Sequence, residues 1–273
     1  MLKDITFGQY VETRSPIHRA DPRVKMVLLI LAVVFIFIAE NWFGHALSAL
    51  FVITTVLVSK VPIKMYLKNL KAILPIIILT SVINMFYGDA TSGVLVEFWG
   101  ISITYDGIYR ALFMSLRIVL LIVVSSSLTY TTTPNDLTDA IERLLTPLKF
   151  IGLKSAVHTL ALMMTIALRF IPTLVEEAEK IMNAQKARGA DLENGSLKER
   201  IKALIPILIP LLISSVRRAY ELAEAMECRC YNGGEGRVRM KQMKCGARDI
   251  FAAAACIVFC AGVIFLNTVP FNL

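Results

Sequence analysis

The charges of this chain are distributed unevenly, and this distribution constrains its fold more than any other feature. Apolar runs with almost no charge fill most of residues 1–133 and 250–273, whereas residues 134–249 are crowded with charged side chains. Over the 273 residues, 56% are apolar and 18% are charged, below the roughly 25% charged residues of a typical soluble domain. The sequence therefore predicts an all-α polytopic membrane protein, in which membrane-spanning helices are joined to a long water-facing segment.

Five apolar runs can cross a bilayer once their flanking residues are included: residues 26–39, 45–58, 72–86, 107–130 and 250–266. For the first run, Arg23, Lys25 and Trp42 would lie at the interfaces and extend the span to about 20 residues. Residues 41–44 are expected to form a tight turn between the first two spans.

These runs divide the chain into three segments. Residues 1–133 carry four spans, residues 134–249 form the water-facing segment, and residues 250–273 carry the fifth span. No cleavable signal peptide is expected, because the first 25 residues are polar.

The Lys and Arg residues indicate the orientation of the spans. Of the 29, five precede the first span, four lie between the second and third, and 18 lie in residues 134–249. The remaining two are in the fourth span, and the loops on the opposite side have none. Cytoplasmic loops of membrane proteins are rich in Lys and Arg, so we expect the N-terminus and residues 134–249 in the cytoplasm. The same rule explains the net charge of +8 better than nucleic-acid binding does.

The cytoplasmic segment is expected to form three long amphipathic helices. The first begins at Pro134 with Thr133 as its cap, and the other two cover residues 155–188 and 197–231. Each of these two begins apolar and ends charged. A hairpin of two membrane-spanning helices is the alternative. We favour helices lying oblique to the membrane, because the apolar part of the third has only 14 residues and two prolines.

The second and third helices end in a similar way. The first end comprises Lys186, Ala187, Arg188 and Gly189, and the second comprises Glu227, Cys228, Arg229, Cys230 and Tyr231. Small side chains would let each helix end enter a groove, where the planar guanidinium can bind carboxylates. The alternative is an ordinary helix C-terminus, in which Arg complements the helix dipole and Gly supplies the cap. Two such ends on helices of the same design favour a docking role.

These features resemble a known family over nearly the whole chain. The resemblance rests on residues 15–25 (Ser-Pro-Ile-His-Arg-Ala-Asp-Pro-Arg-Val-Lys), on Arg117, on residues 131–134 and on the two Arg-centred helix ends. The chain resembles the T component of energy-coupling factor (ECF) transporters, the EcfT/CbiQ family of coupling subunits in ABC-type vitamin and metal importers. This implies a multi-pass protein of a prokaryotic plasma membrane.

The resemblance also implies partners and roles. Ala187, Arg188 and Gly189 would dock on one cytoplasmic ATP-binding subunit, and Cys228, Arg229 and Cys230 on a second. Supporting roles would fall to Lys186, Glu227, Tyr231 and Arg117. The apolar halves of the two helices would hold a separate substrate-binding membrane S component. The second end departs from the Ala-Arg-Gly pattern at both flanks, and we expect its glycine cap to be displaced to Gly233.

Several kinds of chemistry have no motif in the chain. There is no G-x-x-x-x-G-K-[ST] loop, so ATP should be bound by partner subunits and the chain should need no cofactor. Cys228, Cys230 and Cys245 lack a fourth ligand for a metal site. No nucleophile–base set is recognisable, so we expect a non-catalytic subunit rather than a membrane-embedded enzyme.

The remaining alternative is a self-contained secondary transporter. Such proteins carry charged or broken helices near the membrane midplane, and the spans here have few such residues apart from Arg117. A charge within a span is a functional candidate by default. Asp89, Asp106 or a backbone carbonyl could be the partner of Arg117.

Overall fold

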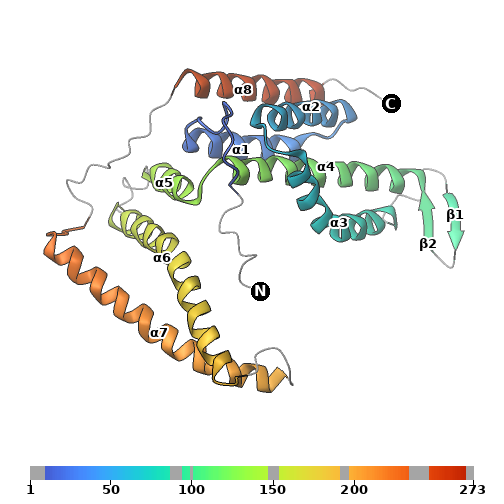
Figure 1. Ribbon diagram of the computed structural model, residues 1–273. Coiled ribbons are helices and arrows are strands. Elements are labelled where there is room, and N and C mark those ends of the chain that lie inside the picture. Colours follow the sequence, from blue (N-terminus) through green and yellow to red (C-terminus); the bar gives the residue numbers. More distant parts are fainter. Residues whose placement is uncertain are drawn as a thin grey trace. The chain divides into compact units, whose positions relative to one another are not determined.

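The computed structural model describes residues 10–86, 94–98, 101–146, 154–190, 197–233 and 246–268. These residues form eight helices (Figure 1): α1 (Pro22–Ile38), α2 (Trp42–Ser59), α3 (Ile63–Phe86), α4 (Tyr105–Thr131), α5 (Pro134–Leu144), α6 (Lys154–Ala187), α7 (Leu197–Cys228) and α8 (Ala247–Thr268). One short antiparallel pair, β1 (Val94–Phe98) and β2 (Ile101–Thr104), lies between α3 and α4. The all-α membrane fold is confirmed, and the strand pair was not predicted.

Two predicted boundaries were wrong. Residues 42–44 belong to α2 rather than to a turn, because the extended backbone of Asn41 already places the helix start at Trp42. Helix α3 begins at Ile63, nine residues before the predicted span. The lysines at positions 64, 68 and 71 are exposed on this helix, so their charged ends can reach water while the helix continues into the apolar run.

Six of the described helices are long and apolar enough to cross a membrane: α2, α3, α4, α8, and the parts of α6 and α7 covering Ala156–Ala187 and Lys202–Cys228. Helix α1, which contains the first predicted span, is not among these six; it has 17 residues, one fewer than α2. Length and composition therefore also admit α6 and α7 as spans, which is the alternative left open above. The chain is a multi-pass membrane protein, and the placement of α6 and α7 at the membrane surface stays a prediction.

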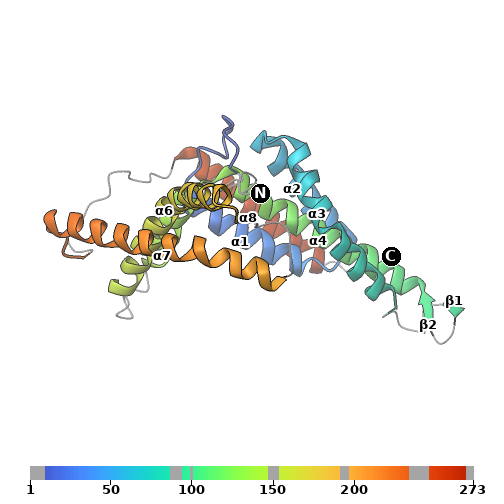
Figure 2. The ribbon, with the colours of Figure 1, turned by 60° about the horizontal axis from the view of Figure 1, so that its bottom comes forward.

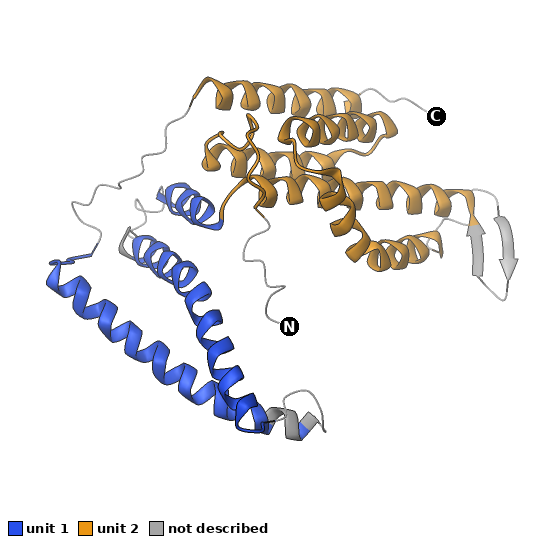
Figure 3. Cartoon of the chain, in the orientation of Figure 1, with its two compact units in different colours: residues 1–7, 134–241 blue, residues 8–133, 242–273 orange. Residues whose placement is uncertain are grey.

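The chain divides into two compact units (Figure 3). We call residues 8–133 and 242–273 the core unit, and residues 1–7 and 134–241 the arm unit. In the core unit α4 packs against α1, α2 and α3, and α8 packs against α1 and α2. The start of α4 lies close to the end of α3, since a Cβ at Gly107 would lie 2.4 Å from the carbonyl oxygen of Met85. Only glycine permits this approach.

The centre of the core unit is apolar. Its buried side chains are Ala32, Ile36, Ala39, Val52, Leu120, Val124, Phe259 and Val263. Phe51 and Phe259 stack with ring centroids 4.4 Å apart, which ties α2 to α8. Many large apolar side chains on α1, α2, α3 and α8 are instead exposed, as expected for helices that face lipid.

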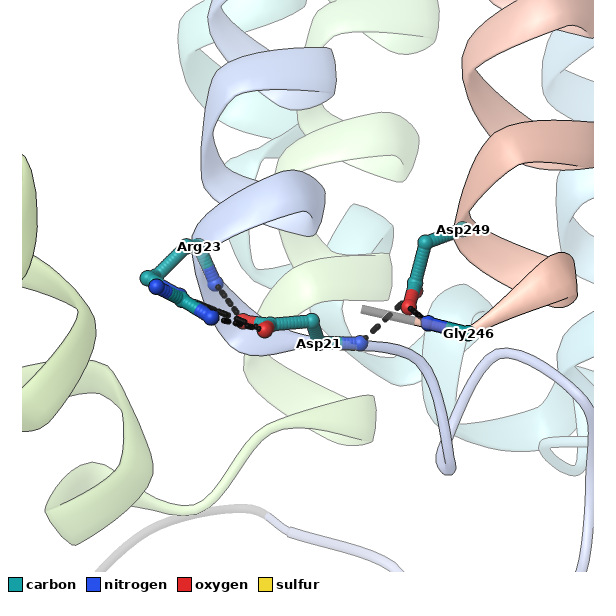
Figure 4. A network of polar contacts seen from close by, with 4 residues as sticks. All are labelled: Asp21, Arg23, Gly246 and Asp249. Carbon is teal, nitrogen blue, oxygen red and sulfur yellow. Dashed lines mark hydrogen bonds and ion pairs between the residues drawn. The ribbon is translucent and has the colours of Figure 1, made fainter. Parts of the chain in front are cut away.

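The residues before α1 connect it to α8 (Figure 4). Asp21 caps α1, and its carboxylate also accepts a 2.6 Å hydrogen bond from Arg23 Nη2. The backbone N–H of Asp21 donates to Asp249 Oδ1, and the N–H of Gly246 donates to Asp249 Oδ2, both at 2.8 Å. Both carboxylates are at most 5% exposed. Part of the family-like segment 15–25 therefore holds two helix starts together.

The same segment contacts the end of α4. Lys25 Nζ donates to the carbonyl oxygen of Thr131 at 3.0 Å, where a cation is favoured by the helix dipole. His18 lies between Ser15 and Val11, with its Nε2–H donating to the Val11 carbonyl at 2.9 Å and its Nδ1 2.7 Å from the Ser15 hydroxyl. Burial lowers the pKa of His18 below its usual value of 6.5. The Val11 hydrogen bond opposes this shift and Lys25 adds to it.

In the arm unit α6 packs against both α5 and α7. Residues later in α6 contact residues earlier in α7, so the two helices run antiparallel where they cross. The turned view of Figure 2 shows α7 passing across α6. Gln185 Nε2 donates to the carbonyl oxygen of Pro206 at 3.4 Å. That oxygen lacks its usual helical partner because Pro210, four residues on, has no N–H. The side chain from α6 thus compensates for a proline in α7.

Candidate functional site

The end of α6 is closed by a specific pattern of backbone hydrogen bonds. The N–H of Gly189 donates to the Lys186 carbonyl and the N–H of Ala190 to the Gln185 carbonyl, both at 3.0 Å. Gly189 has φ +86°, a left-handed conformation that glycine adopts at little cost. This is a Schellman cap, in which Arg188 is the last partly helical residue.

The end of α7 repeats this pattern. The N–H of Cys230 donates to the Glu227 carbonyl at 2.8 Å, and the N–H of Tyr231 donates to the Met226 carbonyl at 3.1 Å. Cys230 has φ 53°. Arg229 therefore occupies the same position in its cap as Arg188, with Cys228 in place of Ala187 and Cys230 in place of Gly189.

The predicted displacement of the second cap to Gly233 is wrong. Cys230 itself takes the left-handed position, directly after Arg229. The Cβ of a residue other than glycine makes this conformation cost roughly 1–2 kcal/mol, and the two cap hydrogen bonds offset that cost. Gly233 also has positive φ, 78°, but it lies three residues beyond the cap.

Both predicted docking ends are accessible. The side chains of Lys186, Ala187, Arg188, Glu227, Cys228, Arg229 and Cys230 are exposed, as is Gly189, while Tyr231 is half-buried. Among the described residues, the guanidinium groups of Arg188 and Arg229 make no ion pair or side-chain hydrogen bond. Each keeps five N–H donors for a carboxylate-bearing partner.

A polar contact fixes the crossing from which the two ends extend. Arg218 donates from Nε and Nη2 to Glu177 Oε2, at 3.1 and 2.8 Å. The Ser214 hydroxyl donates to the other carboxylate oxygen. From this contact each end lies eleven residues further along its helix, or about 16 Å. The helices are antiparallel here, so the ends lie on opposite sides of the crossing (Figure 1).

Sequence reasoning missed this crossing. Glu177 follows the apolar part of α6 within a charged stretch, and its carboxylate joins α6 to α7. Arg218 and Ser214 lie 41 and 37 residues away from it in sequence. The only local signal was that Glu177 follows the apolar stretch of α6 and Arg218 follows the apolar stretch of α7.

Arg117 lies in the core unit. Its Nη2 donates to the carbonyl oxygen of Ala39, the C-terminal cap of α1, at 2.6 Å, and its guanidinium carbon lies 5.2 Å from the ring centroid of Phe113. Of the three partners considered, the backbone carbonyl is confirmed. Asp106 forms an ion pair with Arg110 at 2.9 Å, and Asp89 lies outside the described residues.

The described residues do not gather into a metal site. No group of three or more His, Cys, Asp or Glu side chains comes together within them. Cys228 and Cys230 are free and exposed, and Cys245 lies outside the described residues.

Comparison with known proteins identifies the family. The family described as cobalt transport protein (CbiQ) matches residues 13–240. The energy-coupling factor transporter transmembrane protein EcfT of Ruminiclostridium cellulolyticum is 50% identical over 99% of this chain and its own full length. Those of Clostridium kluyveri and Bacillus subtilis are 48% and 43% identical over 97% and 98% of the chain, and over 97% and 100% of their own lengths. The chain therefore belongs to the EcfT/CbiQ family of energy-coupling factor transporter transmembrane proteins.

Proposed function

We propose that this chain couples ATP hydrolysis by two cytoplasmic ATP-binding subunits to import of a vitamin or metal ion held by a separate membrane S component. In this proposal the N-terminus and the arm unit face the cytoplasm of a prokaryotic cell, and the chain spans the plasma membrane. The chain itself is not an enzyme and carries no cofactor, since ATP is bound by the partners. The observation that carries the proposal is the pair of exposed arginines in matching caps, on either side of one helix crossing.

The caps suit insertion into a groove. Helix ends normally expose carbonyl groups that are costly to remove from water. Here the carbonyls of Gln185 and Lys186, and those of Met226 and Glu227, already accept hydrogen bonds from the cap. We call residues 187–189 the α6 tip and residues 228–230 the α7 tip. What remains at each tip is a guanidinium flanked by small residues, which favours a narrow groove containing a carboxylate.

The arm helices also offer a surface for the membrane partner. Large apolar side chains are exposed along the middle of α7: Leu204, Ile205, Leu208, Ile209, Leu212, Ile213 and Val216. Such a contiguous apolar surface indicates contact with lipid or with another protein. Movement of a tip would reach this surface through the same rigid helix and, at the crossing, through the contact of Glu177 with Arg218.

Retention of the ATP-binding subunits tests the proposal. Arg188→Ala, Arg229→Ala and the double variant should each lose subunits during purification, because a desolvated charge pair that loses one partner typically costs about 2–5 kcal/mol. Arg217→Ala is the matched control, since Arg217 is exposed on the same helix as Arg229. Wild-type retention and uptake in the double variant would show that the arginines do not dock.

A further inference from the structure

The two matching caps differ in one chemical respect. The residues that flank Arg188 are Ala187 and Gly189, which have no reactive side chain, whereas those that flank Arg229 are Cys228 and Cys230. Both thiols are free and exposed. The other described cysteines, Cys256 and Cys260 in α8, are buried and half-buried.

We propose that the α7 tip is a thiol-modification site, at which a low-molecular-weight disulfide modifies Cys228 or Cys230 and thereby blocks docking. The α6 tip has no such control. This inference rests on the proposed function and adds a regulation to one of its two docking ends.

The position of the thiols explains why modification should matter. Cys is accepted beside Arg229 because it is nearly as small as the Ala and Gly of the α6 tip. A group attached to the sulfur of Cys228 or Cys230 makes that side chain much larger than Ala or Gly, on one or the other side of the guanidinium. Glutathione, for example, would place a bulky tripeptide with net negative charge next to Arg229, where it competes with the partner's carboxylate and fills the groove.

The chemistry is ordinary thiol–disulfide exchange. The thiolate of Cys228 or Cys230 attacks one sulfur of the small disulfide, and a new S–S bond forms as the original one breaks. The departing half leaves as a thiolate and takes up a proton equivalent to the one that the cysteine lost. A free thiol reductant reverses the reaction by the same exchange. Exposure makes the reaction possible, because attack requires access to the disulfide.

The proposal has a reciprocal consequence. If docking and modification exclude each other, a bound ATP-binding subunit must protect the two thiols to the extent that modification weakens binding. Cys228 and Cys230 should therefore react with a maleimide more slowly in the assembled complex than in the chain alone. The labelling of Cys256 and Cys260 should be the same in both samples.

The test uses the full chain in membranes, with Cys245→Ser to remove the thiol that lies outside the described residues. Oxidised glutathione should add to Cys228 or Cys230, as seen by mass, and lower retention of ATP-binding subunits about tenfold or more. Dithiothreitol should restore retention. The variant Cys228→Ala with Cys230→Gly repeats the residues of the α6 tip and has no thiol there, so oxidised glutathione should not change its retention relative to the same variant left untreated. Adding Ala187→Cys to that variant should make docking sensitive again.

The outcomes separate the two proposals. If the modified chain retains its subunits while Arg229→Ala loses them, docking stands and thiol control is wrong. If Arg188→Ala, Arg229→Ala and the modified chain all retain them, the docking proposal itself is wrong. Failure of oxidised glutathione to modify either cysteine in the subunit-free chain would also overturn thiol control, as would an equal loss of retention when the Cys228→Ala, Cys230→Gly variant is treated.

Discussion

The contact between Glu177 and Arg218 should determine how well movement passes between the two arm helices. Arg218 donates two hydrogen bonds to one carboxylate oxygen of Glu177, and Ser214 donates to the other. The side chains are 37% and 23% exposed for Arg218 and Glu177, so water screens the pair. Solvent-exposed ion pairs change an equilibrium by only a few-fold, and the hydroxyl hydrogen bond adds a similar effect. Replacing Glu177 with Ala should therefore weaken the crossing by about five- to tenfold in the equilibrium constant of the contact.

The assay is the ratio of substrate imported to ATP hydrolysed in reconstituted vesicles. Glu177→Ala should lower this ratio while the ATP-binding subunits stay bound, because the tips themselves are unchanged. Arg218→Ala should do the same, and the double variant should be little worse than either single variant, since all three remove one interaction. Glu176→Ala is the matched control, because Glu176 is an exposed neighbour on the same helix. Additive losses in the double variant, or an equal loss with Glu176→Ala, would refute a coupling role for this contact.

Three further predictions concern the caps and the core unit. Cys230→Gly should raise the free energy of opening the last turn of α7 by about 1 kcal/mol, because glycine adopts the left-handed conformation without the Cβ penalty. Amide hydrogen exchange in that turn should therefore slow, and faster exchange would contradict the Schellman assignment. Asp249→Ala removes the acceptor of the Asp21 and Gly246 N–H groups. It should lower core stability by about 1–3 kcal/mol, seen as a lower melting temperature, and an unchanged melting temperature would count against the contact. Burial lowers the pKa of His18 in the folded chain. As pH falls through about 6.5, His18 therefore becomes protonated in the unfolded chain while it stays neutral in the folded chain. The core unit should lose stability there, and His18→Gln should remove that pH dependence.

Local sequence signals predicted most of the helices. The apolar runs and the capping residues placed α4, α5, α6 and α7 within a few residues of their observed bounds. The arginines and small residues at the ends of α6 and α7 also indicated where those helices stop. These signals are reliable because they depend on interactions within one helix turn.

Contacts between distant residues left no such signal. Asp21 and Asp249 are 228 residues apart, and Glu177 and Arg218 are 41 apart. Periodicity identifies a buried face but not its partner, so neither pair could be predicted from one sequence. The left-handed conformation of Cys230 was missed for a different reason, because Gly233 nearby is the residue that usually takes this role.

Site-specific cross-linking tests the docking of the arm tips most directly. A photo-reactive amino acid at Lys186 or at Glu227 lies beside an arginine tip without replacing the residues that flank the guanidinium. In membranes containing the whole transporter, both positions should yield adducts with an ATP-binding subunit, and Arg217 replaced in the same way should yield none. Absence of such adducts from both tips, or adducts formed equally well from position 217, would contradict docking through Arg188 and Arg229.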